Sequence, residues 1–212
     1  MFLSTTEDRD TPRHGAVLRR ISLPRTPVNK QALTYHRLGR SSDLGERSTV
    51  TEVVLRHGRA ADEEPAVALW RAASAARRGG RPVRADHEQR VRSYTRKPDA
   101  FLLLAEDARE VLGMGLGMQG LADDGAGLPV PELCHIAMIF VAPERWGEGI
   151  GGRVLGGVLD EARSRGYERV QLWTHADNAR AQRLYENYGF RRSGREKSDD
   201  LGEWIVHYER TL

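Results

Sequence analysis

The sequence predicts an α+β fold, in which helices and strands share one core. Two apolar segments, 101–106 and 111–119, flank the polar turn 107–110 and indicate a β-hairpin. A nearly continuous apolar strand at 133–141 is followed by a glycine-rich turn, a helix and another strand at 169–174. Because such strands are buried on both faces, we expect 133–141 to be central in its sheet.

Composition excludes several classes of protein. Hydrophobic residues make up 39% and charged residues 30%, and no run approaches the roughly 18 apolar residues that span a bilayer. We therefore expect no membrane partner. The first residues lack a cationic segment followed by an apolar one, so no secretory signal is expected, and the single cysteine, Cys134, excludes an internal disulfide and a thiolate-rich metal site. These features predict a cytoplasmic protein without a bound metal.

The chain is predicted to consist of an extension and one domain. Residues 1–48 are rich in Arg, Pro and Ser without periodicity, which indicates a flexible extension. The net charge of +3 arises from this region, and no predicted face combines basic with aromatic residues. Nucleic acid is therefore an unlikely partner. Residues 49–212 form the predicted domain.

The first half of the domain is expected to contain a strand, two helices and the hairpin. Val53–Leu55 indicates a short strand, and Asp62 caps a helix that ends at Gly79. A second helix is expected over 86–94. Within the hairpin, three glycines are expected to keep one face of the strand flat against a close neighbour: Gly115, Gly117 and Gly120.

The second half begins with the central strand and the glycine turn. The following helix carries an apolar stripe of Ile150, Val154, Val158 and Ala162, with Gly166 just past its end. A last helix runs from Asn178 to Gly189. The strands 190–192 and 204–208 then form a second hairpin around a polar loop, 193–202.

The glycine turn, 147–152, is predicted to bind a phosphate group. Glycines let the backbone approach a ligand, and the N–H groups that start a helix form an anion site. Gly147, Gly149 and Gly152 also match a dinucleotide-binding pattern, but that site needs an acidic residue about 20 positions later, where the chain has 171–174, Gln-Leu-Trp-Thr. A simple flexible turn is the remaining alternative.

Two motifs in this order resemble the GCN5-related N-acetyltransferase (GNAT) superfamily. They are Val141-x-Pro143 followed by Gly147-x-Gly149-x-Gly151, and Asn178-x-x-Ala181-x-x-Leu184-Tyr185-x-x-x-Gly189-Phe190. The resemblance covers about residues 50–212. It implies an acyl-CoA N-acyltransferase fold of three layers, with helices flanking a mixed, mostly antiparallel sheet that splays in a V between the fourth and fifth strands.

The resemblance also implies where acetyl-CoA would bind. Pantetheine would enter the splay and pair with the backbone of Ile139 and Val141, while Asn178 would hold the pantetheine arm. The pyrophosphate would bind backbone N–H groups of the turn and its flanks: Trp146, Gly147, Glu148, Gly149, Gly151, Gly152 and Arg153. Trp146 departs from the family, which often has Gln or Arg at this position.

Three residues are candidates for the chemistry. Tyr185 would lie near the thioester sulfur and protonate the departing thiolate. His135 is a candidate base because histidine titrates near neutral pH, and strand alternation predicts that it shares a face with Ile139; a core histidine is the equal alternative. Glu132 is the second candidate base. Cys134 is adjacent to His135 and should point to the opposite face, which argues against a nucleophilic role.

The predicted function is transfer of an acetyl group from acetyl-CoA to a primary amine, of a small molecule or a peptide N-terminus. The alternative is a non-catalytic module that binds acyl-CoA through the same fold. The substrate wall is expected to include 79–86 and 193–202, with Arg195, Glu196, Asp199 and Asp200. The acids among them would suit a cationic amine, and solvation of an exposed loop explains them equally well. A homodimer is possible.

Overall fold

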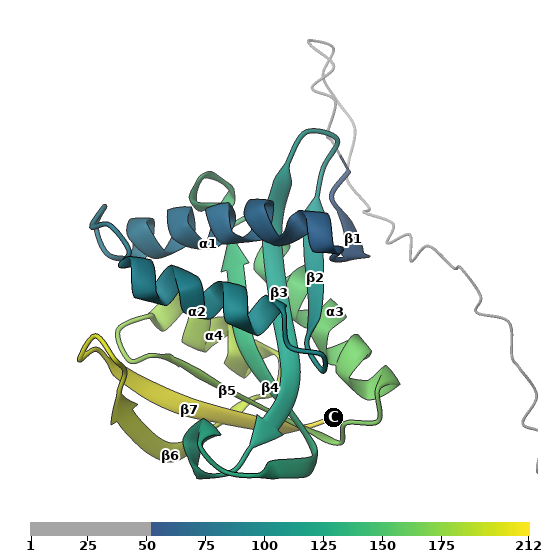
Figure 1. Ribbon diagram of the computed structural model, residues 1–212, viewed down its shortest axis with the longest axis vertical. Coiled ribbons are helices and arrows are strands. Elements are labelled where there is room, and N and C mark those ends of the chain that lie inside the picture. The colour runs from purple at the N-terminus through teal and green to yellow at the C-terminus, as the bar shows by residue number, and fades with distance from the viewer. Residues whose placement is uncertain (1–51) are drawn as a thin grey trace, which may run out of the picture. The chain divides into compact units, whose positions relative to one another are not determined.

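The computed structural model describes residues 52–212, so the predicted extension lies outside the described residues. The described chain folds around a seven-stranded sheet of order β1-β2-β3-β4-β5-β7-β6, and only the β4–β5 pair is parallel (Figure 1). The elements are β1 (Val54–His57), α1 (Glu63–Arg77), α2 (Ala85–Thr95), β2 (Phe101–Glu106), β3 (Val111–Leu121), β4 (Pro129–Val141), α3 (Ile150–Ser164), β5 (Arg169–His175), α4 (Ala179–Asn187), β6 (Arg191–Ser198) and β7 (Trp204–Thr211). The predicted mixed α+β architecture is confirmed, with β4 at the centre.

Helices cover the two faces of the sheet in pairs (Figure 1). On one face, α1 and α2 pack through Val67, Trp70 and Val91 onto β2, β3 and β4. On the other, α3 and α4 pack through residues that include Val158 and Tyr185 onto β2, β4, β5 and β7. These are called the α1–α2 face and the α3–α4 face below. None of the helices within 52–212 is long and apolar enough to cross a bilayer.

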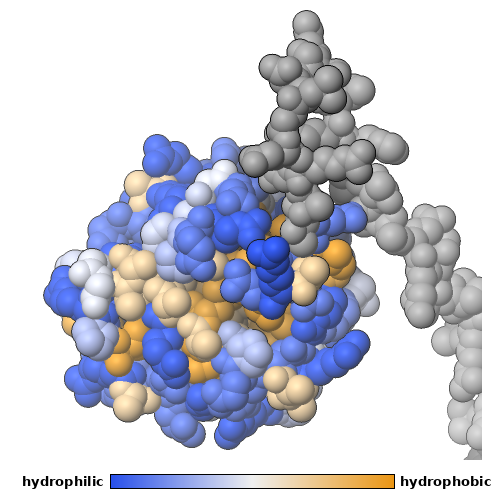
Figure 2. Space-filling view, turned by 90° about the horizontal axis from the view of Figure 1, so that it is seen from above, coloured by the Kyte–Doolittle hydropathy of each residue, from blue (hydrophilic) through white to orange (hydrophobic). Residues whose placement is uncertain are grey.

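The parallel pair separates part-way along its length. Leu133–Ile136 pairs with Arg169–Leu172, and no pairing continues between the later residues of β4 and β5. The predicted V-shaped splay is therefore present. Figure 2 looks onto the end of the molecule toward which β4 runs in Figure 1, and shows an apolar band surrounded by hydrophilic side chains.

A bulge interrupts β4 at Ala137. The pairing with β3 shifts between Ile136 and Met138, so Ala137 has no partner there. Ile136 and Ile139 both pack on the α3–α4 face, although unbroken alternation would place them on opposite faces. His135, next to Ile136, consequently lies on the α1–α2 face. The prediction that His135 shares a face with Ile139 and Val141 is wrong, because the extra residue reverses the alternation.

The last hairpin is longer than the sequence predicts. β6 extends to Ser198 and pairs with β7, so the predicted polar loop 193–202 is a strand in its first part. β6 is an edge strand with mostly exposed residues on both sides. It therefore carries no alternation of apolar and polar residues from which a strand could be predicted. β4 likewise begins at Pro129, four residues before the predicted start at Leu133.

The glycines of β3 allow a close approach, as predicted. A Cβ at Gly115 would lie 2.6 Å from Cγ2 of Val158 on α3, and one at Gly117 would lie 2.3 Å from Cζ of Phe101. A Cβ at Gly120 would likewise be 2.6 Å from Cγ of Leu133. Side chains at these positions would push the neighbouring residues away.

Gly115→Ala should lower the free energy of unfolding by about 1–3 kcal/mol, because the new methyl group overpacks the contact with α3. Chemical denaturation measures this change. The matched control is Gly156→Ala on α3, where a Cβ would make ordinary contact 3.6 Å from Cε1 of Tyr188. Alanine is also the better helix former, so the control should gain roughly 0.5–1 kcal/mol. Equal stability of Gly115→Ala and the wild type would contradict the packing argument.

Candidate active site

Two cavities meet where β4 and β5 separate. The first, the glycine-turn groove, has about 480 Å³ and runs between the turn after β4 and helix α4. The second, the Trp173 cleft, has about 320 Å³ and lies between α1, α2, the end of β5 and the turn before β7. Six residues line both cavities: Arg77, Ile139, Phe140, Asn178, Ala181 and Tyr185. A long ligand in the groove could thus present its end to a second ligand in the cleft.

The edge of β4 offers backbone hydrogen-bonding groups to the groove. The N–H of Ala142 donates to the carbonyl of Leu112 at 2.9 Å, which fixes the phase of the antiparallel pairing with β3. Residues of such a pair turn their N–H and C=O alternately toward and away from the partner strand. The polar groups of Ile139 and Val141 therefore point toward β5, which has diverged. An extended ligand could pair there as a further strand.

The glycine turn is built to bind an anion. Gly147 and Gly149 have φ values of +94° and +80°, which glycine adopts without strain. Gly149 is the N-cap of α3, and an N-cap residue and the first helical residues have N–H groups without intrahelical partners. These groups, with the positive end of the helix dipole, favour a phosphate. Glu148 does not oppose this, because its carboxylate pairs with Arg145 at 2.9 Å.

Trp146 forms a fixed wall of the groove. Its Nε1 donates to the carbonyl of Val141 at 2.8 Å, and the guanidinium carbon of Arg180 lies 3.8 Å from the centroid of its ring. The arrangement stacks a cation on an indole, a favourable contact. The hydrogen bond from Nε1 also occupies part of the acceptor capacity of the Val141 carbonyl. The sequence did not indicate this contact.

Asn178 and Tyr185 occupy the junction of the two cavities. Asn178 caps α4, with Oδ1 accepting the N–H of Ala181 at 3.2 Å. Tyr185 is buried against the rings of Phe190 and Tyr208, and burial raises the pKa of its phenol. Among the described residues its hydroxyl has no hydrogen-bond partner. Tyr185 therefore remains protonated at neutral pH and can donate its proton to a group at the junction.

Arg153 does not line the groove. Its guanidinium donates to the carbonyl of Val53, and its backbone N–H donates to Gly149 within the helix at 3.2 Å. The side chain points to the start of β1 rather than toward the turn. The prediction that Arg153 binds the pyrophosphate is therefore not supported, whereas Arg145, Arg180 and Arg183 do line the groove.

The two predicted bases also lie outside both cavities. His135 has a buried Nδ1 without a hydrogen-bond partner in the described chain, and burial lowers its pKa to about 4. Glu132 is exposed near the start of β4. A catalytic role for either stays a prediction that the geometry does not favour. Cys134 is buried in the α3–α4 core, which raises its pKa to about 12 and agrees with the argument against a nucleophile.

The Trp173 cleft is lined by three residues that the sequence analysis did not predict: Arg77, Arg78 and His175. Nδ1 of His175 lies 3.2 Å from Oε2 of Glu203, and Glu203 also pairs with Arg77 and, at 3.4 Å, with Nε of Arg78. Burial, then the charge of Arg77, lowers the pKa of His175. His175 ends β5 beside the carboxyl end of the parallel strand β4, where functional groups of such sheets often lie. The position of His175 at the end of a strand could have identified it as a candidate from the sequence.

The predicted substrate wall is present only in part. Val83, Asp199, Asp200 and Leu201 line the cleft, whereas Arg195 and Glu196 do not. Among described residues, His175, Asp199 and Glu203 have ligand atoms within 4.8 Å of one another, a spacing that a metal could bridge. Arg77 and Arg78 already compensate Glu203.

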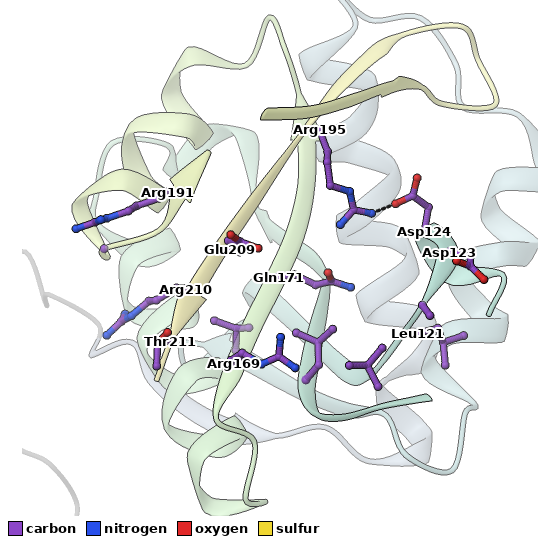
Figure 3. Close-up of a pocket in the computed structure, with 15 residues that line it drawn as sticks. Leu121, Asp123, Asp124, Arg169, Gln171, Arg191, Arg195, Glu209, Arg210 and Thr211 are labelled. Carbon is purple, nitrogen blue, oxygen red and sulfur yellow. Dashed lines mark hydrogen bonds and ion pairs between the residues drawn. The ribbon is translucent and has the colours of Figure 1, made fainter. Parts of the chain in front are cut away.

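A larger groove lies elsewhere, on the face of β5 and β7 that α1 and α2 leave uncovered (Figure 3). It has about 690 Å³ and includes Arg169, Gln171 and Glu209. Arg195 forms an ion pair there with Asp124, drawn as a dashed line in Figure 3. Of the predicted site residues in the described chain, only Arg195 of the substrate wall lines it, so size does not identify the site.

Comparison with protein families matches residues 65–190 to the acetyltransferase (GNAT) family. The chain belongs to this family. Sequence relatives include the mycothiol acetyltransferases of Clavibacter sepedonicus and Clavibacter michiganensis subsp. michiganensis, 35% and 34% identical over 149 residues. These segments cover 70% of this GNAT chain but 46% and 45% of those proteins. The chain thus spans about half the length of the curated relatives it matches.

Solved structures of GNAT proteins share the fold. Ribosomal-protein-alanine N-acetyltransferase of Brucella melitensis has a TM-score of 0.58 and 20% identity, covering 75% of this chain and 99% of that chain. PaiA N-acetyltransferase of Thermoplasma acidophilum, solved in complex with coenzyme A, has a TM-score of 0.56 and 15% identity, covering 76% and 99%. At this identity the likeness concerns the fold alone.

A buried histidine beside Trp173 makes stability sensitive to acid. Nε2 of His207 lies 3.0 Å from Oε1 of Gln171, and Nδ1 lies 2.8 Å from the hydroxyl of Ser193. An amide oxygen only accepts, so Nε2 carries a proton and donates it to Gln171. Burial lowers the pKa of His207 to about 4, and the charges of Arg195 and Lys197 act in the same direction.

The free energy of unfolding should therefore fall as the pH drops from about 6.5 toward 4, because the unfolded histidine binds a proton that the folded one does not. His207→Gln should flatten this dependence in chemical denaturation at pH 7, 5.5 and 4.5, and His135 accounts for part of what remains. His57→Gln, at a side chain that is 62% exposed, is the control. An unchanged pH dependence in His207→Gln would refute the assignment.

Proposed function

We propose that the protein transfers an acetyl group from acetyl-CoA to a primary amine by direct attack. The observation that carries this proposal is that the glycine-turn groove and the Trp173 cleft meet at Tyr185. The glycine turn suits the diphosphate of coenzyme A, and the free edge of Ile139 and Val141 suits its pantetheine arm. The donor would lie in the groove and the acceptor in the cleft, which requires no acyl-enzyme.

In this mechanism the amine nitrogen attacks the thioester carbonyl, the new C–N bond forms and the C–S bond breaks. Tyr185 gives its phenolic proton to the departing thiolate and regains a proton from the attacking nitrogen, which loses one as it becomes an amide. We assign His175 as the base that removes the ammonium proton, since its lowered pKa keeps it neutral and Glu203 would stabilise its charged form. The N–H of Ile139, which points into the splay, would stabilise the negative charge on the carbonyl oxygen.

A small-molecule amine is the preferred acceptor. The sequence relatives are named for acetylation of mycothiol, a small molecule, and the cleft of about 320 Å³ fits an acceptor of that kind. A protein N-terminus, as in the name of the Brucella melitensis neighbour, is the second choice because that neighbour shares only the fold. Residues 49–212 would form the catalytic domain, and 1–48 an accessory extension.

Isothermal titration should detect acetyl-CoA binding, and Gly149→Ala should weaken it about tenfold. A side chain disfavours the left-handed φ, so the turn relaxes and must recover its binding conformation at a cost of roughly 1–2 kcal/mol. Gly166→Ala is the matched control. Its φ of +84° imposes a similar cost at the far end of α3, away from the groove. That variant should lose stability but bind as the wild type does. Absence of acetyl-CoA binding by the wild-type protein would refute the proposed donor.

Tyr185→Phe should slow release of the coenzyme A thiol by a factor on the order of 10²–10⁴ and leave acetyl-CoA binding unchanged. Thiol release is followed over a panel of small amines, polyamines and peptides. Tyr208→Phe is the control, because it removes a neighbouring hydroxyl that bonds Glu186 at 3.0 Å. His175→Gln should lose rate in the same assay. A wild-type protein that binds acetyl-CoA but releases no thiol would be the non-catalytic module instead.

A further inference from the structure

Arg78 lines the Trp173 cleft and carries buried donors without partners among the described residues. It is the C-cap residue of α1, and its side chain is only 16% exposed. Nε and Nη1 are buried and have no hydrogen-bond partner in the part of the chain that the structure describes. The nearest carboxylate is that of Glu203, whose Oε1 lies 3.4 Å from Nε without forming a hydrogen bond.

Glu203 cannot satisfy Arg78, because it is shared. Its carboxylate accepts a hydrogen bond from Arg77 and lies 3.2 Å from the ring of His175. One negative charge therefore faces two guanidinium groups and an imidazole. A buried guanidinium without acceptors is costly, so this position gains most from a ligand that supplies them.

The other acidic groups of the cleft are already engaged. Oδ1 of Asp199 accepts the backbone N–H groups of Leu201 and Glu203, both at 2.9 Å. Asp200 forms an ion pair with Arg90. Two of the three carboxylates that the sequence offered as partners for a cationic amine thus hold the turn before β7 and its contact with α2. The uncompensated charge that remains in the cleft is positive.

We propose that the acceptor is an aminocarboxylate, whose carboxylate binds Arg78 while its amine reaches the junction at Tyr185. This inference rests on the proposed function and specifies its substrate class. The end of the Arg78 guanidinium that carries Nη1 and Nη2 matches a carboxylate through two parallel N–H···O bonds, while Nε lies on the side that faces Glu203. A carboxylate is favoured over a phosphate because the negative charge of Glu203, 3.4 Å from Nε, would repel a dianion more strongly.

The walls of the cleft restrict the chemistry of the rest of the acceptor, apart from its amine and its carboxylate. Trp70, Tyr94 and Trp173 line it from α1, α2 and β5. Aromatic rings contribute apolar contact area, so the part of the acceptor between its amine and its carboxylate, or the side chain there, should be apolar or aromatic. Free amino acids of this kind are the simplest members of the class.

The test compares each amino acid with its C-terminal amide, which keeps the amine and the side chain but lacks the negative charge. Glycine, alanine, phenylalanine and tryptophan and their amides are assayed by thiol release from acetyl-CoA. Arg78→Gln should raise KM for the acids about tenfold to a hundredfold, with little change in kcat, and leave the amides unaffected. Comparing the acid-to-amide ratio between the variant and the wild type cancels the intrinsic reactivity of each amine.

Two further variants separate binding from folding. Arg78→Lys keeps the charge but not the fork, and should give an intermediate KM. Arg71→Gln removes an exposed guanidinium of the same helix, which pairs with Glu88 outside the cleft, and should leave the acid-to-amide ratio unchanged. Thermal unfolding shows whether each variant is folded.

Binding is measured in parallel by titrating the same pairs into protein saturated with coenzyme A. The wild type should bind the acids more tightly than the amides, and Arg78→Gln should not. If no amine releases thiol but this difference is present, the proposed function fails and the carboxylate site stands. If acids and amides behave alike in the wild type, or if Arg78→Gln weakens both equally, the inference is overturned even where acetyl transfer occurs.

Discussion

β4 and β5 hydrogen bond over four residues and then separate, and the candidate site depends on this separation. The parallel pairing ends at Ile136 and Leu172. Beyond it, the N–H and C=O groups on one edge of β4 have no strand to pair with, which would be costly in a closed interior and is useful beside a groove. The glycine turn follows at the end of the same strand, so the diphosphate site and the free edge are held in register by one element.

The two cavities differ in how they are charged. The glycine-turn groove relies on backbone N–H groups and a helix dipole, with arginines at its rim, and it needs no charged side chain in direct contact. The Trp173 cleft is instead lined by Arg77, Arg78 and His175, which share the half-buried Glu203. The groove would therefore suit one invariant ligand, whereas the cleft carries the side chains that distinguish between acceptors.

Sequence patterns predicted what is local. The helices, the hairpins and the glycine turn each depend on residues close together in the chain. The bulge at Ala137 does not, because it arises from the pairing of β4 with β3, and it moved His135 to the other face. β6 was missed because an edge strand exposed on both sides has no apolar alternation.

The base proposed from the structure was hidden for a similar reason. Arg77, His175 and Glu203 come from the end of a helix, the end of a strand and a turn, and only the topology of the sheet brings them together. Strand order cannot be deduced from periodicity alone. The sequence therefore indicated most residues of the glycine-turn groove, and the Trp173 cleft only through two candidate loops.

The carbonyl groups of Val141 and Ile139 on the free edge of β4 are not equally available, because the indole of Trp146 hydrogen bonds to the first of them. Its N–H already occupies the carbonyl of Val141, while the carbonyl of Ile139, one repeat deeper, faces the splay. A peptide-like arm that docks along this edge meets a competitor near the mouth of the groove and none at the deeper position. Its alignment would then be fixed from the inside, next to Tyr185, and the outer part of the arm would be left adjustable. An edge of this kind tolerates variation in the part of the ligand near the glycine turn, while it holds the reacting end of the ligand in one place.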